Sequence, residues 1–251
     1  MTDGVLFVHA FPLDARMWQE QQSALAGAVP VAAVNLPGFG GTSLAGEIMT
    51  MALAAERVVE ELDRLGFDRA MVCGLSMGGY VALELWRRHG DRILGLVLAN
   101  TRAEADSEEG KERRRLVAEL VLSEGTEAIL EQMRTLVSLE ATTDVWDFVA
   151  GIVRSQPPEA VAAASLGMAE RPDSRPDLPG IDVPTLVVTS TGDRLIPPEV
   201  TSSMAETIPD ATLAVIDGAG HLSNVERTIE FNRLLEDHLA RCGLLEQRPG
   251  R

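Results

Sequence analysis

Short apolar runs alternate with helical patterns along most of the chain. The runs are rich in β-branched residues and bounded by Gly, Pro or charged residues, which predicts strands. They are apolar throughout, as is typical of a parallel sheet covered by helices on both faces. The pattern therefore predicts an α/β fold with a mostly parallel sheet of about six strands. The predicted strands are Val5–His9, Val29–Val34, Ala70–Gly74, Ile93–Ala99, Thr185–Thr189 and Thr212–Ile216.

Several of the intervening segments carry apolar residues at the spacing of amphipathic helices. One spans Met51–Leu65 and is ended by Gly66. Another follows Ser76 and closes before Gly90, and a last one covers Thr228–Arg241. We expect these helices to flank the sheet.

The stretch from residue 101 to 175 interrupts the alternation, because it has helical stripes and no convincing strand. A simple crossover between parallel strands needs only about a dozen residues, and this stretch is several times longer. We therefore expect an all-helical cap at residues 101–175 over the carboxyl edge of the sheet, inserted into a core of residues 1–100 and 176–251.

The strongly negative net charge of the chain disfavours some classes of binding partner. The 251 residues carry a formal net charge of −16, with 45% hydrophobic and 24% charged residues. This composition is ordinary for a globular domain, but the negative charge argues against nucleic acid or an anionic membrane as a partner. The field of the whole chain does not favour a strongly acidic substrate either, although the charge inside a pocket can differ.

The two cysteines indicate a reducing compartment. Cys73 lies inside an apolar run and is expected to be a buried thiol, far in sequence from Cys242. No basic segment precedes an apolar stretch at the amino end, and no apolar run has the length of a membrane span. We therefore expect a cytoplasmic protein without a membrane partner.

Ser76 lies between two glycines, at the junction of a predicted strand and a predicted helix, in the run Gly74-Leu75-Ser76-Met77-Gly78. Small neighbours let the backbone turn tightly, so that the hydroxyl is exposed as in a nucleophile elbow. The amides at the start of the following helix point at the place where an oxyanion would form. Ser76 is therefore the candidate nucleophile.

A serine nucleophile needs a base, and His221 is the best placed of the four histidines. It follows the last strand in a glycine-rich loop that can present its ring over the sheet edge. His9 ends the first strand, whereas His89 and His238 belong to predicted helices and are expected to be solvated.

The base needs a carboxylate to orient it, either after the fourth strand or after the fifth. The fourth strand is followed by Asn100, which carries no charge, and the fifth by Asp193. Asp217 is a weaker rival, because it lies too close in sequence to His221 to reach its ring easily. We predict a triad of Ser76, Asp193 and His221, whose chain order suits this architecture.

An oxyanion hole requires two backbone N–H groups. One is that of Met77, directly after the serine, and the other is that of Phe11 in the loop after the first strand. The same loop spells H-x₄-D from His9 to Asp14, a pattern seen in some acyltransferases. No other feature of the sequence supports that pattern, and we discount it.

Three aromatic residues, Trp18, Phe39 and Trp146, are candidate walls of a substrate pocket. Core packing is the alternative role for each of them. The apolar stripes of the expected cap suggest that Leu, Val and Met side chains line the same pocket.

Several segments resemble the α/β-hydrolase fold family, in its branch of small carboxylesterases and oxoadipate-enol-lactone-type hydrolases. They occur in the family's order and span nearly the whole chain. The resemblance implies the triad and oxyanion roles given above, a helical lid at the cap, and no metal or organic cofactor. The segments are His9–Asp14, Asn35–Ser43, Gly74–Gly79, Gly192–Pro197 and Gly218–His221.

The chain departs from the family pattern near its amino end. Ala10 stands where the family usually has glycine, and is expected to crowd the oxyanion loop slightly. The chain begins at what would be the family's third strand, so the family's first hairpin is expected to be missing.

The leading hypothesis is a serine hydrolase that cleaves small carboxylic esters or lactones through an acyl-enzyme intermediate. A cofactor-free haloperoxidase or a carbon–carbon bond hydrolase would use the same triad, and a ligand-binding receptor would keep the pocket with little turnover. The expected partner is the small-molecule ester or lactone, and a homodimer stays open as an assembly.

Overall fold

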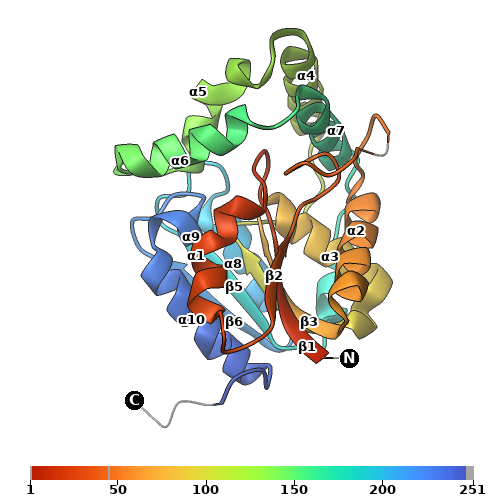
Figure 1. Cartoon of the computed structure of the whole chain (residues 1–251), viewed down its shortest axis with the longest axis vertical. Helices are drawn as coiled ribbons and strands as arrows, with labels where there is room; N and C mark the ends of the chain where they lie inside the picture. The colour runs from red at the N-terminus through yellow and green to blue at the C-terminus, as the bar shows by residue number, and fades with distance from the viewer. Residues whose placement is uncertain (1, 45, 247–251) are drawn as a thin grey trace.

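One parallel sheet runs through the molecule (Figure 1). The computed structural model describes residues 2–44 and 46–246. Its strands follow the order β2-β1-β3-β4-β5-β6, and neighbouring strands are parallel. The described residues thus form the parallel six-stranded sheet that the sequence predicts. The strands are β1 (Thr2–Val8), β2 (Val31–Val34), β3 (Phe67–Leu75), β4 (Ile93–Ala99), β5 (Thr185–Ser190) and β6 (Ala211–Ile216).

Four strands begin elsewhere than their hydrophobic runs suggest, among them β1, which begins at Thr2 rather than Val5, and β6, which begins at Ala211 rather than Thr212. β2 begins only at Val31, since Pro30 has no N–H to donate to the ladder. β3 begins at Phe67 rather than Ala70, because Phe67 pairs with Thr2 at the start of β1. The charged residues that follow Phe67 hide this extension in the hydrophobic pattern.

Helices cover both faces of the sheet (Figure 1). On one face lie α1 (Gln19–Leu25) and α10 (Thr228–Arg241). On the other face lie α2 (Met51–Leu65), α3 (Met77–His89) and α8 (Pro198–Thr207). The bounds of α2, α3 and α10 agree with the helices that the sequence predicts. Among the described residues, no helix combines the length and the apolar character that crossing a membrane requires.

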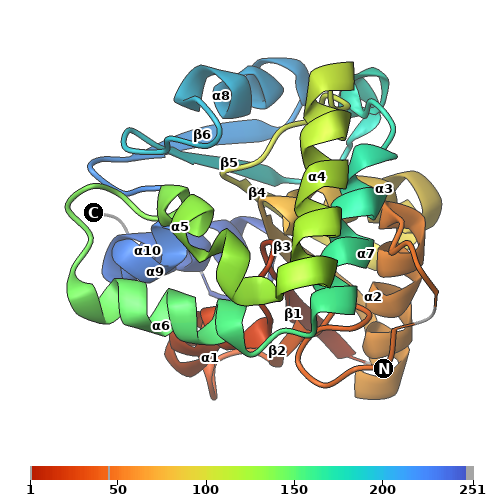
Figure 2. The same cartoon turned by 90° about the horizontal axis from the view of Figure 1, so that it is seen from above.

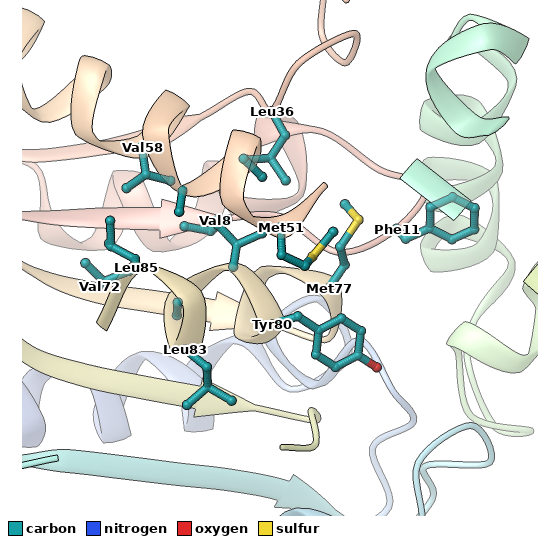
Figure 3. Close-up of a cluster of buried hydrophobic side chains, with 14 of the residues drawn as sticks. Val8, Phe11, Leu36, Met51, Val58, Val72, Met77, Tyr80, Leu83 and Leu85 are labelled. Carbon is teal, nitrogen blue, oxygen red and sulfur yellow. The ribbon is translucent and has the colours of Figure 1, made fainter. Parts of the chain in front are cut away.

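The sheet divides the hydrophobic core into two layers, because successive side chains of a strand point to opposite faces. In β3, Val72 belongs to the layer under α2 and α3, whereas Cys73 belongs to the layer under α1 and α10. Figure 3 shows the first layer, in which Val72 lies near Val58 of α2 and Leu85 of α3. Strands buried on both faces are apolar throughout, and this explains why the hydrophobic pattern predicts them well.

The stretch from residue 101 to 175 forms helices and turns and, within the described residues, no strand. Figure 1 shows these helices above the carboxyl ends of the strands, and Figure 2 shows α4 lying along α7. The main helices are α4 (Glu108–Glu124), α5 (Leu130–Met133), α6 (Thr143–Arg154) and α7 (Pro158–Ala169). The described residues also form the short helices η1 (Ala15–Trp18), η2 (Gly90–Arg92), η3 (Thr126–Ile129), η4 (Arg134–Leu136), η5 (Arg175–Gly180) and α9 (Ser223–Glu226).

Candidate active site

Ser76 occupies a strained turn between β3 and α3. Its φ of 55° lies in the left-handed region that favours glycine. Two hydrogen bonds hold this conformation: the N–H of Ser76 donates to the C=O of Ala99 at 3.0 Å, and Thr101 Oγ1 donates to the C=O of Ser76 at 2.7 Å. A non-glycine residue in such a conformation costs about 1–3 kcal/mol and is typical of functional sites.

The glycines around Ser76 allow backbone segments to approach each other closely. A Cβ at Gly74 would lie 2.1 Å from the carbonyl oxygen of Gly78, and a Cβ at Gly78 would lie 2.1 Å from that of Val8. Any side chain at these positions would therefore push α3 away from β3 and β1. The amino end of α3 is thus brought next to the loop that follows β1.

His221 and Asp193 form a buried pair. His221 Nδ1 lies 2.8 Å from Asp193 Oδ2, and both side chains are fully buried. The carboxylate can only accept, so the contact requires the proton on Nδ1. Within the described residues, the other ring nitrogen of His221, Nε2, has no hydrogen-bond partner. An imidazole in this state has one nitrogen oriented by a carboxylate and the other available as a base.

Backbone and side-chain donors surround the carboxylate of Asp193. Its Oδ1 accepts the N–H groups of Leu195 and Ile196, each at 2.9 Å. Burial by itself raises the pKa of Asp193, but attraction to His221 and the hydrogen bonds from His221 and Ile196 outweigh it. The pKa of Asp193 is therefore held below its usual value, and the group is a carboxylate at neutral pH.

Asn100 is a site residue whose part the sequence does not reveal. Its Nδ2 donates to Asp193 Oδ2 at 3.0 Å and to Ser190 Oγ at 2.7 Å, and its Oδ1 accepts from Ser223 Oγ at 2.6 Å. The side chain is fully buried and its backbone has a φ of 43°. Asn100 carries no charge, so the sequence marks it only as a residue that cannot serve as the acid. The signal for its part is its place directly after β4, beside the strand β5 that precedes Asp193.

The amides of Phe11 and Met77 meet the first requirement for an oxyanion hole, since they are available donors. Within the described residues, neither N–H makes a hydrogen bond. Met77 begins α3, and Phe11 lies in the loop that Gly78 brings close to that helix. In Figure 3, Phe11 and Met77 lie at one end of the core layer, and the Phe11 ring points towards the cap helices.

The residues of the H-x₄-D pattern have structural contacts. His9 Nδ1 donates to the C=O of Ala10 at 3.0 Å, and its Nε2 accepts the N–H of Leu36 at 3.1 Å. Burial lowers the pKa of His9 to about 4, so the ring is neutral at physiological pH. Asp14 accepts hydrogen bonds from Arg16 and, at 2.8 Å, from Gln156 Nε2. Both ring nitrogens of His9 are occupied, which leaves no free base in this loop.

A cavity of about 230 Å³ lies beside Ser76, and helices α4, α5 and α7 contribute to its walls. Tyr80 of α3 and Thr135 of η4 add polar groups to its walls. Its apolar walls include Phe11, Val117, Met133, Leu136, Met168 and Ile196. Its charged lining residues are Arg102, Asp106, Arg113 and Arg114.

Trp18, Phe39 and Trp146 are absent from the described lining of this cavity, so the expectation that they form its walls needs correction. Trp18 is fully buried and stacks on Phe7 with ring centroids 4.8 Å apart. Phe39 is fully buried beside the ring of His9, and Trp146 packs under the guanidinium of Arg134. Large apolar side chains are used here to fill the core.

The expectation of solvated histidines also needs correction. His238 is only 2% exposed, because α10 turns it towards the core, and burial lowers its pKa to about 4. His89 is half-buried, and its Nε2 lies 3.1 Å from Glu56 Oε1. Neither histidine lines the cavity beside Ser76.

Hydrogen bonds join the loops that carry His221 and Asp193 to the segment between α5 and α6. The N–H of Leu222, next to His221, donates to the C=O of Leu136 at 2.9 Å. Arg194, next to Asp193, donates to the C=O of Val137 at 3.1 Å. The segment between α5 and α6 is therefore held by both loops at once.

Comparisons with known proteins find relatives that match most of the chain. The chain is 32% identical over 258 residues to the dihydrolipoyllysine-residue acetyltransferase component of the acetoin cleaving system of Cupriavidus necator, covering 94% of this chain but 63% of the relative's length. It is 28% identical over 235 residues to 3-oxoadipate enol-lactonase 1 of Acinetobacter baylyi, covering 90% of this chain and 85% of that protein.

Among solved structures, a thermophilic esterase from Thermogutta terrifontis with malate bound superposes with a TM-score of 0.93. It is 40% identical, and the match covers 96% of this chain and 90% of the esterase. The sequence model of the alpha/beta hydrolase family matches residues 5–234. The chain therefore belongs to the alpha/beta hydrolase family, in the branch that contains esterases and enol-lactonases.

Proposed function

We propose that this carboxylic ester hydrolase cleaves small esters or lactones through an acyl-enzyme intermediate formed on Ser76. The observation that carries the proposal is the buried His221–Asp193 pair, whose Nδ1···Oδ2 distance is 2.8 Å while Nε2 has no partner among the described residues. The esterase and enol-lactonase relatives support hydrolysis of an ester bond.

In the proposed reaction, Ser76 Oγ attacks the carbonyl carbon while its proton passes to His221 Nε2. The tetrahedral intermediate then breaks the bond between the carbonyl carbon and the alcohol oxygen, and His221 returns the proton to the leaving oxygen. Water repeats the same steps on the acyl-enzyme, which frees the acid and restores Ser76. Asp193 holds the ring in the tautomer that this requires and stabilises its charged form.

The N–H groups of Phe11 and Met77 are proposed to stabilise the oxyanion of each intermediate. Both amides lack a partner among the described residues, and Met77 lies at the amino end of α3, where the helix dipole favours negative charge. Donors that are fixed before the reaction cost no reorganisation when the charge develops.

We also propose that residues 1–100 and 176–251 form the catalytic core and that residues 101–175 form a cap that encloses the substrate. The helices α4, α5 and α7 support this division, because they supply residues to the cavity wall. Residues 1, 45 and 247–251 of these ranges lie outside the described residues. The free thiols of Cys73 and Cys242 support a reducing compartment such as the cytoplasm.

The test uses covalent labelling by a fluorophosphonate probe followed by mapping of the labelled peptide. We expect the wild type to be labelled at Ser76, and Ser76→Ala to lose labelling and ester hydrolysis while keeping its melting temperature within a few degrees. Ser203→Ala, at an exposed position of α8, is the matched control and is expected to keep both activities. Labelling at another serine, or hydrolysis that survives in Ser76→Ala, would contradict the proposal.

A further inference from the structure

The cavity beside Ser76 carries more positive than negative charge. Its charged lining residues are Arg102, Arg113, Arg114 and Asp106. The carboxylate of Asp106 already forms two ion pairs, with Arg114 at 3.2 Å and with Arg171 at 2.8 Å. The whole chain has a net charge of −16, so the charge of this cavity is opposite in sign to that of the molecule.

Arg102 is the cavity guanidinium that lacks an anion. Within the described residues it makes no hydrogen bond and no ion pair, whereas Arg113 pairs with Glu109 at 3.1 Å on the surface. Arg102 is half-buried, and it lines the cavity together with Ser76 and Tyr80. A guanidinium that is partly removed from water gains most from an anionic partner, and the protein does not provide one here.

The backbone of Arg102 is fixed relative to Ser76. The preceding residue, Thr101, is fully buried and donates from Oγ1 to the C=O of Ser76 at 2.7 Å. The C=O of Thr101 accepts a hydrogen bond from Thr201 Oγ1 at 2.8 Å. The backbone from which the Arg102 side chain extends is therefore held at a set position relative to the nucleophile.

Building on the proposed function, we propose that the substrates of this enzyme carry a free carboxylate, and that the Arg102 guanidinium binds it. A guanidinium matches a carboxylate with two parallel hydrogen bonds, which fixes orientation as well as position. The cavity volume of about 230 Å³ lies below the roughly 300–1,000 Å³ of typical ligand pockets, so a short chain separates the carboxylate from the ester. The apolar walls, among them Met133 and Ile196, contact that chain.

The experiment compares kcat/KM values on matched pairs of esters. In one pair the carboxylate belongs to the acyl part (monomethyl succinate against methyl pentanoate), and in the other to the alcohol part (3-acetoxypropionate against butyl acetate). We expect the wild type to prefer the carboxylate member of at least one pair by about tenfold or more, the effect of a charge-assisted hydrogen bond. The preferred pair identifies the side of the ester that carries the carboxylate.

Arg102→Gln removes the charge and is expected to lower kcat/KM for the preferred carboxylate ester by about tenfold or more relative to its neutral partner, and so to abolish the preference. Arg115→Gln is the matched control, because Arg115 lies on α4, is exposed and pairs with Glu112 at 3.0 Å outside the cavity. It loses the same charge and is expected to keep the preference.

A wild type without preference in either pair, or an Arg102→Gln variant that loses activity equally on both members, would overturn the inference. If the neutral esters are hydrolysed and Ser76 is labelled while the preference is missing, only this inference fails. If no ester is hydrolysed and Ser76 is not labelled, the proposed function fails and this inference fails with it.

Discussion

Replacing Asn100 by aspartate is expected to make the stability of this protein depend steeply on pH. Asn100 is fully buried, and its Nδ2 donates to Asp193 Oδ2 at 3.0 Å. Asn100→Asp keeps the size and shape of the side chain but sets a second carboxyl against Asp193. Two adjacent carboxylates disfavour each other's ionisation, so the pKa of one of them rises.

The size of this effect follows from Coulomb's law. Two unit charges 3.0 Å apart repel each other by about 5 kcal/mol at an effective dielectric constant of about 20. This energy corresponds to a rise of about 4 in the pKa of one carboxyl. A group whose pKa is higher in the folded state destabilises that state as pH rises above its unfolded value. The free energy of unfolding is thus expected to fall by about 1.4 kcal/mol per pH unit between about pH 4 and pH 8, relative to the wild type.

Urea unfolding curves recorded between about pH 5 and pH 8 measure this difference. Asn232→Asp is the matched control, because its half-buried side chain already accepts a hydrogen bond through Oδ1, from Gln21 Nε2 at 2.9 Å. Its free energy of unfolding is expected to stay within about 0.5 kcal/mol of the wild type across this range. A difference between Asn100→Asp and the wild type that does not change with pH would refute the reasoning.

Two further predictions concern a tight contact and a buried thiol. Gly220→Ala is expected to lower both the melting temperature and the ester hydrolysis rate, because a Cβ there would lie 2.3 Å from the backbone N of Ser138. Gly151→Ala, which has open space around its Cβ position, is the control, and equal melting temperatures for the two variants would count against the steric argument. Cys73 is expected to resist a disulfide reagent in the native state and to react after unfolding, because burial raises its pKa well above the usual value. Rapid native-state modification of Cys73, identified by peptide mapping, would show that β3 opens locally.

The sequence predicts the sheet well because most of its strands are buried on both faces. Val72 and Cys73 point to opposite core layers, and both are apolar, so the run is unbroken. The hydrophobic pattern misses strand residues that pair with a neighbouring strand without lying in an apolar run. Phe67 joins β3 through its pairing with Thr2, and the charged residues after it give no sign of a strand.

The candidate site is predicted only in part, because a pattern records residue types and not contacts. Ser76, Asp193 and His221 can be selected from their places at the ends of strands, where a parallel sheet gathers loops. Asn100 has no charge that would suggest a role in the site. Its role depends on hydrogen bonds to the side chains of Ser190, Asp193 and Ser223, which lie far from it in sequence. Trp18 is a residue type that often lines ligand pockets, yet here its ring stacks on Phe7 in the core.

Some residues that line the cavity also make hydrogen bonds to the buried His221–Asp193 pair or to its loops. A change at these residues therefore affects both the cavity and the pair. Ile196 lines the cavity with its side chain, and its N–H donates to Asp193 Oδ1 at 2.9 Å. Leu136 also lines the cavity, and its C=O accepts the N–H of Leu222 beside His221. Met133 of α5 and Met168 of α7, in contrast, line the cavity without a hydrogen bond to either loop among the described residues. Substitutions at the two methionines should therefore alter substrate choice while leaving the rate on small neutral esters intact, whereas changes at Ile196 should alter both.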